Sequence, residues 1–392
     1  MALKECTLGT PYPGAVGQTF DVSNRAWPRL LRGKGAQPQH LQTRYWNNYL
    51  MNAKFTWFLL VSLILPSITT SATPLPIAKD IITSLALTQD QVAKLDRGEI
   101  VALKIGEATE KELAISLGIY LPLAPAKLVA YFKSGALASI DPDTIERGDM
   151  QPNSDVDVFK RFTFSSKQGD EAEGLLDAAA NDKFNLSTDE IGGFVPLKTK
   201  LAAADNTALI AGVTQYYREI LLQRWQAYRK GGLPGIAPYA RRDGPEASPA
   251  KELRAATVSS KFLARYYPDL YNAWLNYPAE LPAGAEEQFY WLNRKVENRP
   301  TAILGHRVLQ TSDAGSVILS RQFFVGHSYN SSQLTAGCLP YRNGSIVFYT
   351  HRTSTDQVAG MGSSLKHSIG REQMKEQMVK NLERIRSASQ SF

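Results

Sequence analysis

Alternating apolar positions dominate the last hundred residues of the chain. In 317–329 the odd positions are more apolar than the even ones, which is typical of a strand with one covered face. Asn343-Gly344 lies between two further apolar segments and predicts a hairpin, because a type I′ turn needs two residues that tolerate positive φ. We therefore expect an antiparallel meander with strands at 301–310, 317–329, 333–341 and 345–352.

A long helix should follow this meander, from Ser363 to Arg386. Ser363 can cap its first turn. Five apolar residues recur near helical spacing and predict one buried stripe: Leu365, Ile369, Met378, Leu382 and Ile385. We expect an amphipathic helix that lies across a curved sheet.

The earlier part of the chain mixes strands and helices. Apolar and small residues alternate in 113–121, which predicts a strand, and 98–105 and 155–165 are weaker strand candidates. Short and long helices are expected at 126–134 and 206–230. Aromatic residues at 262–291 are interpreted as the core of a helical part. Segregated strands and helices favour an α+β class, with a helical insertion at about 170–280.

The first 72 residues differ from the rest. Residues 51–72 combine Lys54, a run of about 11 apolar residues and a small-residue end, the pattern of a secretory signal peptide. We interpret 1–50 as a disordered extension assigned upstream of the true start at Met51, and 73–392 as a single mature domain. The protein is then expected to be exported, to the periplasm or the medium.

Charge and cysteine content change little in this picture. The chain has 44 Lys and Arg against 37 Asp and Glu. Seven of these cations and two of these anions precede residue 73, so the mature part carries 37 minus 35, or +2. We expect no nucleic-acid partner. Cys338 is the single mature cysteine, which excludes an intramolecular disulfide there and favours a small buried residue.

This element order resembles the START-like, or polyketide-cyclase/Bet v 1-like, helix-grip superfamily. The resemblance rests on the strand at 98–105, the strand-to-helix step LPLAPAKLVAYF, and the final sheet closed by a helix. It covers about 98–165 and 285–386. It implies an apolar cavity between the sheet and the long helix. The chain also resembles a group of uncharacterised exported bacterial proteins.

Candidate chemistry is sparse. Three histidines fall on expected strands (His306, His327 and His351), but their spacing matches no compact metal motif. Arg307 and Arg321 also fall on strands, where a buried guanidinium would need an anion. A glycine-rich turn at 360–362 is best explained as a helix cap. We expect no catalytic residue, cofactor or metal site.

Three functions are compatible with these observations. The first is an exported protein that binds a hydrophobic or amphipathic small molecule between the sheet and the last helix. Its expected ligand-binding residues are Arg321, Phe323, His327, Tyr329, Tyr349 and His351. The second is a hydrolase- or cyclase-like enzyme that uses the strand histidines and Arg321. The third is a protein-interaction module that acts through the helical insertion, and peripheral membrane contact by the aromatic group also stays open.

Overall fold

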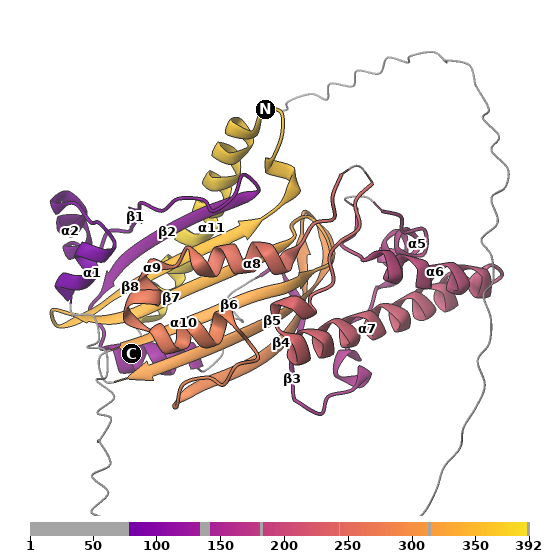
Figure 1. Ribbon diagram of the computed structural model, residues 1–392, viewed down its shortest axis with the longest axis horizontal. Helices are drawn as coiled ribbons and strands as arrows, with labels where there is room; N and C mark the ends of the chain where they lie inside the picture. Colours follow the sequence, from indigo (N-terminus) through magenta and orange to yellow (C-terminus); the bar gives the residue numbers. More distant parts are fainter. Residues whose placement is uncertain (1–77, 134–141, 181–182, 243, 313–314, 390–392) are drawn as a thin grey trace, which may run out of the picture. The chain divides into compact units, whose positions relative to one another are not determined.

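A single eight-stranded antiparallel sheet organises the fold (Figure 1). The computed structural model describes residues 78–133, 142–180, 183–242, 244–312 and 315–389, so the expected extension and signal peptide lie outside the described residues. The strand order is β1-β2-β8-β7-β6-β5-β4-β3. The strands are β1 Val101–Leu103, β2 Glu112–Leu121, β3 Thr144–Met150, β4 Ala285–Val296, β5 Arg299–Ser312, β6 Gly315–Val325, β7 Ser331–Tyr341 and β8 Gly344–Ser354.

The expected meander is confirmed, because β4 to β8 are neighbours in sequence order. Its last turn is displaced by one residue. Gly344 already pairs with Tyr341, so Arg342 and Asn343 form the turn, and Arg342 has a φ of 52°. Gly344 is required for another reason: a Cβ there would overlap the carbonyl of Leu121 at the end of β2. A second two-residue turn, at 297–298, joins β4 to β5 with both φ values positive, as a type I′ turn requires.

Helices precede, interrupt and follow the strands. They are α1 Ala78–Ser84, α2 Gln89–Asp96, α3 Pro125–Lys133, α5 Gly169–Leu176, α6 Thr188–Leu201, α7 Asn206–Gly231, α8 Pro249–Val258, α9 Lys261–Tyr266, α10 Pro268–Leu275 and α11 Ser363–Ser389. Those from α5 to α10 form a helical insertion between β3 and β4. The class is therefore α+β, with a long C-terminal helix.

Two expectations for the middle of the chain are wrong. The segment 155–165 is not a strand: a short 3-10 helix, Val156–Phe159, begins it, and Asp155 caps that helix through its side chain. Its alternating phenylalanines instead enter the core beneath α7. Residues 289–291 belong to β4 rather than to the helical part, although Phe289 and Trp291 do pack against the helices.

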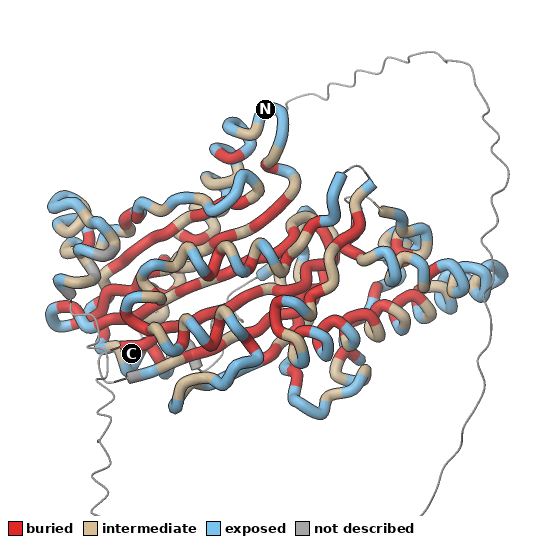
Figure 2. Tube along the Cα trace, in the orientation of Figure 1, coloured by how far each residue is buried: buried red, intermediate tan, exposed pale blue. Residues whose placement is uncertain are grey.

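The two faces of the sheet are covered differently. One face, here called the insertion face, carries Phe348, Leu319 and Trp291 and packs against α2 and α7 to α10. Figure 1 shows α8, α9 and α10 lying over the strands, and Figure 2 shows that these strands are buried along most of their length. This face holds most of the aromatic core.

The other face, here called the α11 face, carries Leu117 and Ile119 of β2. Three residues of α11 pack against it, Met378, Leu382 and Ile385, as expected. Leu365 and Ile369 do not: they are 67% and 52% exposed. The first half of α11 instead places Gly370 against Leu113 of β2 and His367 against Glu107 and Glu110, before β2, so the buried stripe is narrower than the sequence period suggested.

None of the described helices combines the length and the apolar character needed to cross a bilayer.

Candidate functional site

The six expected ligand-binding residues do not form one site. Cross-strand pairing places Tyr349 opposite Leu117, and His351 opposite Leu334, so both lie on the α11 face. Arg321 pairs with His306 and faces the other way, into the aromatic core of the insertion face. Phe323 follows Arg321 and stacks on Tyr228 of α7. Arg321, the expected head-group anchor, is therefore separated by the sheet from Tyr349 and His351.

His327 and Tyr329 lie beyond the end of β6, in the connection to β7. His327 is buried and saturated: its Nε2 lies 2.7 Å from Oγ1 of Thr301, and its Nδ1 lies 2.7 Å from Oγ of Ser328. Burial lowers the pKa of His327 to about 4, so the ring is neutral near pH 7. This histidine holds the β6–β7 connection and has no free nitrogen for a ligand. Tyr329 donates its hydroxyl proton to Oε1 of Gln322, at 2.6 Å.

A strip of aromatic and polar side chains crosses the α11 face. The rings of Tyr349 and His351 are nearly parallel, with centroids 6.2 Å apart. Nε2 of His351 lies 2.6 Å from the hydroxyl of Ser332 on β7. Further along the sheet, Tyr290 of β4 reaches the hydroxyl of Ser320 on β6, at 3.0 Å. Rings, hydroxyls and an imidazole thus alternate across the strands.

Tyr290 owes its position to Gly305. A Cβ at Gly305 would overlap the ring of Tyr290, so the missing side chain on β5 lets the tyrosine lie flat across the sheet and reach β6. Arg307 stacks above the same ring, with its Cζ 5.1 Å from the centroid. Sequence reasoning missed this tyrosine because it assigned β4 to the helical part.

Exposure distinguishes this strip from the opposite face. On the insertion face, every second residue of β6 from Val317 to Arg321 is buried. Gln333 and Thr335 of β7 are buried on the same face. On the α11 face of the same strands, buried positions such as Ser320 and Ser332 alternate with half-buried ones. Together with their neighbours on β4 and β8, the half-buried residues are Tyr290, Ile318, Gln322, Leu334, Ala336, Tyr349 and His351. On this face α11 packs against β2 and α3 packs against β6 and β7, while the half-buried residues keep part of their surface accessible.

The electrostatics of the strip keep its imidazole neutral. Burial lowers the pKa of His351 to about 4, and the charge of Arg294 on β4 acts in the same direction. Three strands separate β4 from β8, so an effect of Arg294 on His351 fits a sheet that curves around its α11 face. A neutral ring can accept or donate one hydrogen bond without a counter-ion.

A second cluster is buried in the insertion face. The hydroxyl of Tyr228 lies 2.8 Å from Nδ1 of His306, and Nε2 of His306 lies 3.0 Å from Oε1 of Glu287. Burial lowers the pKa of His306 to about 4. Beside them the Arg321 guanidinium stacks on Trp274, with its Cζ 3.7 Å from the ring centroid.

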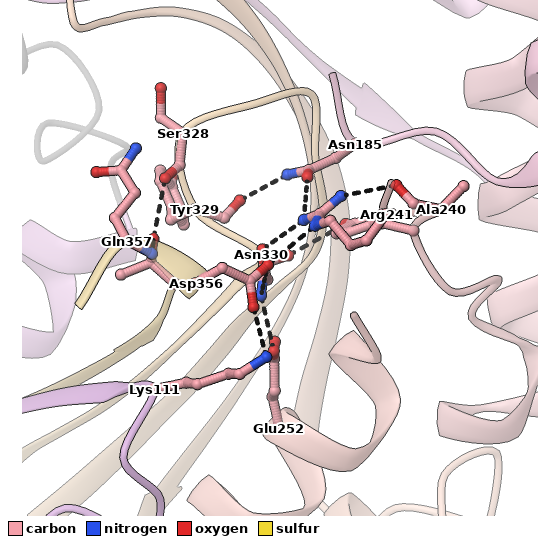
Figure 3. Close-up of polar contacts among 12 residues, drawn as sticks. Lys111, Asn185, Ala240, Arg241, Glu252, Ser328, Tyr329, Asn330, Asp356 and Gln357 are labelled. Carbon is pink, nitrogen blue, oxygen red and sulfur yellow. Dashed lines mark hydrogen bonds and ion pairs between the residues drawn. The ribbon is translucent and has the colours of Figure 1, made fainter. Parts of the chain in front are cut away.

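A polar network ties the insertion to one end of the sheet (Figure 3). Arg241 donates to Asn185 at 2.9 Å and to Asn330 at 3.0 Å, and its Nε donates to Asp356 at 3.0 Å. Asn330 in turn donates to Glu252 of α8, at 2.9 Å. Because the donors and acceptors of this network satisfy one another, we interpret it as a structural junction.

The carboxyl groups of the junction have opposite pKa shifts. Burial raises the pKa of Glu252, despite hydrogen bonds from Asn330 and Ser331. Burial would also raise the pKa of Asp356, but hydrogen bonds from Lys111 and Arg241 outweigh it and lower that pKa. Nothing in the sequence pattern joined these residues, which are separated by up to 245 positions.

The three strand histidines do not meet. His306 and His351 lie on opposite faces of the sheet, and His327 lies in a connection. Among the residues that the structure describes, no cluster of three His, Cys, Asp or Glu side chains could hold a metal ion. The three histidines therefore do not form one centre in the described structure.

Comparison with known proteins gives no match: no family model, no curated protein and no solved structure is significantly similar to the chain, so the function must be argued from its geometry.

Proposed function

We propose that this protein binds a hydrophobic or amphipathic small molecule on the α11 face of its sheet. The observation that carries the proposal is the strip of half-buried residues across β4 to β8, whose opposite face is more completely buried. Apolar and aromatic side chains that stay exposed forgo the free energy of burial, and patches of them commonly mark binding surfaces. In the described chain α11 packs against β2 and α3 packs against β6 and β7, and the residues of the strip remain half-buried beside them.

The side chains of the strip suggest how a ligand would be oriented. Tyr349, Leu334 and Ala336 offer apolar contact, and Gln322 and His351 offer hydrogen bonds without net charge. Arg294 on the β4 side is paired with Asp143, at 3.7 Å, so the strip carries little net charge. A molecule with an apolar body and an uncharged polar end fits this distribution better than a strongly charged one.

The fold-level proposal is a helix-grip of the START-like kind. It is supported by the pairing of β2 with β8 and by the packing of α11 along β2. In that fold the surface between the sheet and the last helix is the ligand site, which agrees with the strip described above. We also propose export, on the signal-like pattern of 51–72.

Native mass spectrometry of the protein purified from the periplasm tests this function. A stoichiometric adduct that organic solvent releases would identify the ligand class. Ala336→Phe should abolish the adduct, because it fills the centre of the strip. Ala227→Phe is the matched control, since Ala227 is exposed on α7 and should retain the ligand. If both variants fold and keep the adduct equally, the ligand does not occupy the α11 face.

The absence of an adduct needs a second test. Thermal unfolding would then be followed with a panel of fatty acids, phospholipids and sterols. A melting temperature that rises for the wild type and for Ala227→Phe, but not for Ala336→Phe, supports the proposal. No rise with any of them would refute it for lipid-like ligands.

A further inference from the structure

Arg321 is a buried cation without a matching anion. Its side chain is 0% exposed, and one nitrogen, Nη2, donates to the backbone carbonyl of Trp274, at 2.8 Å. Nε and Nη1 have no hydrogen-bond partner of good geometry among the described residues. Two charged donors in the protein interior are therefore unsatisfied, which is rare and costly.

The neighbouring titratable groups cannot supply the negative charge. Burial raises the pKa of Tyr228 far above 10, and burial raises the pKa of Tyr277 to about 12, so both phenols are neutral. His306 is neutral as well, because burial lowers its pKa to about 4. The carboxylate of Glu287 contacts His306 rather than the guanidinium. Arginine itself does not lose its proton in proteins.

The other buried arginines of the described chain show what is missing. Arg352 lies 2.7 Å from Oε2 of Glu112, and Arg224 lies 2.5 Å from Oε2 of Glu190. Each is nearly inaccessible to solvent and each has a carboxylate. Arg321 is the most deeply buried of the three and has an aromatic ring where the others have an anion. A cation–π contact contributes about 2 kcal/mol when desolvated, less than a buried unpaired charge costs.

We propose that Arg321 binds a small carboxylate, enclosed between the sheet, α7 and α10. Nε and Nη1 would donate to its oxygens, and Trp274 and Phe323 would pack against its apolar part. A monoanion matches the single charge of the guanidinium, whereas a phosphate dianion would leave a net negative charge in an aromatic surrounding. This site is independent of the ligand surface on the α11 face.

The buried cluster around Arg321 reaches the surface at Glu287, through His306. The Glu287 side chain is 35% exposed and lies 3.0 Å from Nε2 of the buried imidazole. Because this nitrogen faces a carboxylate, the neutral ring carries its proton on Nε2, and Nδ1 accepts from the Tyr228 hydroxyl. The oxygen of Tyr228 thus lies on the side of Arg321 and interacts with its guanidinium, as a neutral dipole rather than an anion. Under the proposal, a carboxylate that enters beside Glu287 meets the negative charge of this side chain.

The test is thermal unfolding and calorimetric titration of the full chain with sodium acetate and sodium benzoate, against sodium chloride at equal ionic strength. We expect a saturable rise of several degrees in the melting temperature of the wild type with a carboxylate. Arg321→Gln should abolish it. Arg265→Gln is the matched control, because Arg265 also lies over a ring, that of Tyr266, but is exposed. An equal response of wild type and Arg321→Gln would overturn the proposal.

Glu287→Gln keeps the test decisive if Arg321→Gln does not fold. It removes the charge at the entrance and should strengthen acetate binding about threefold to tenfold. Unchanged affinity, or no binding to the wild type, would refute the site. Ala336→Phe should keep the full carboxylate response, so failure of this proposal and failure of the ligand surface on the α11 face are distinguishable.

Discussion

The buried ion pair between Glu112 and Arg352 allows the cost of an unpaired core cation to be measured in this fold. The pair joins the first residue of β2 to β8, at 2.7 Å, and the two side chains are 2% and 8% exposed. Oε2 of Glu112 also accepts from the backbone N–H of Ala108, at 2.5 Å. Glu112→Gln keeps an acceptor for Ala108 and removes only the charge, which makes Arg352 resemble Arg321.

The expected magnitude follows from this burial. Removal of one partner of a buried pair costs about 3 to 5 kcal/mol, because the remaining charge keeps its desolvation penalty. We expect Glu112→Gln to cost about 3 kcal/mol. Arg352→Met should cost less at low pH, where Glu112 can be protonated. The double variant should lose less than the sum of the two single losses, by about 2 kcal/mol or more.

The pH dependence has a definite sign. Burial raises the pKa of Glu112 from its ordinary value of 4.5, and the charge of Arg352 opposes this rise. The folded state therefore binds more protons than the unfolded state above pH 4.5, and stability falls as the pH rises through the folded pKa. Arg352→Met removes the opposing charge and should extend this loss toward neutral pH.

Urea unfolding of the three variants between pH 4 and 8 measures these quantities, provided that the slope with denaturant stays constant. The reasoning is refuted if Glu112→Gln costs less than about 1 kcal/mol, or if the two single losses add within about 0.5 kcal/mol. A small loss would also weaken the inference at Arg321, since this core would then tolerate an unpaired guanidinium without a ligand.

Three further predictions concern other parts of the structure. Asp356→Asn should lower the free energy of unfolding by about 1 to 3 kcal/mol at pH 7. Because the pKa of Asp356 is lowered below 3.8, this loss, measured by urea unfolding, should vanish as the pH falls below that pKa. A loss that persists at pH 2 would contradict the assignment. Cys338 is 1% exposed, and burial raises its pKa to about 11. In a variant that lacks Cys6, a thiol reagent should therefore label Cys338 only at the rate of unfolding. Fast labelling in native buffer would show that Cys338 is accessible in the folded state. Gly337→Ala would place a Cβ against the ring of Phe348 and should cost about 1 to 3 kcal/mol in the same unfolding assay, whereas Gly106→Ala, with open space around it, should be nearly neutral.

Local sequence signals were sufficient for much of the fold. The alternation in 113–121 and the apolar stripe of 206–230 are strong local patterns, and β2 and α7 follow them closely. Segments with weaker patterns were missed. β3 is a mostly polar edge strand that carries Arg147 and Asp149, so its sequence lacks the apolar face that would predict a strand. The phenylalanines of 155–165 recur at every second or third position. Both a strand and an irregular segment can bury side chains at this spacing, so the pattern did not distinguish the two.

The candidate site was harder to predict, because period-two alternation identifies the faces of a strand but does not say which helix covers each. Arg321 and His351 therefore looked like members of one site, although tertiary packing put them on opposite faces. The partners of Arg321 come from α7 and α10, some 47 to 93 positions earlier in the chain. Tyr290 was missed with β4, and its flat position depends on a glycine of the neighbouring strand.

The pairing of β2 with β8 has a consequence for how the chain is made. Ser116 contacts Thr350 across 234 positions, so β2 has only the three-residue β1 as a partner until nearly the whole protein has been synthesised. The apolar side of β2 waits still longer for α11, which follows β8 in the chain. Completion of the sheet thus carries a high loop-closure cost. Truncation within the last forty residues should leave β2 uncovered and make the polypeptide dependent on chaperones.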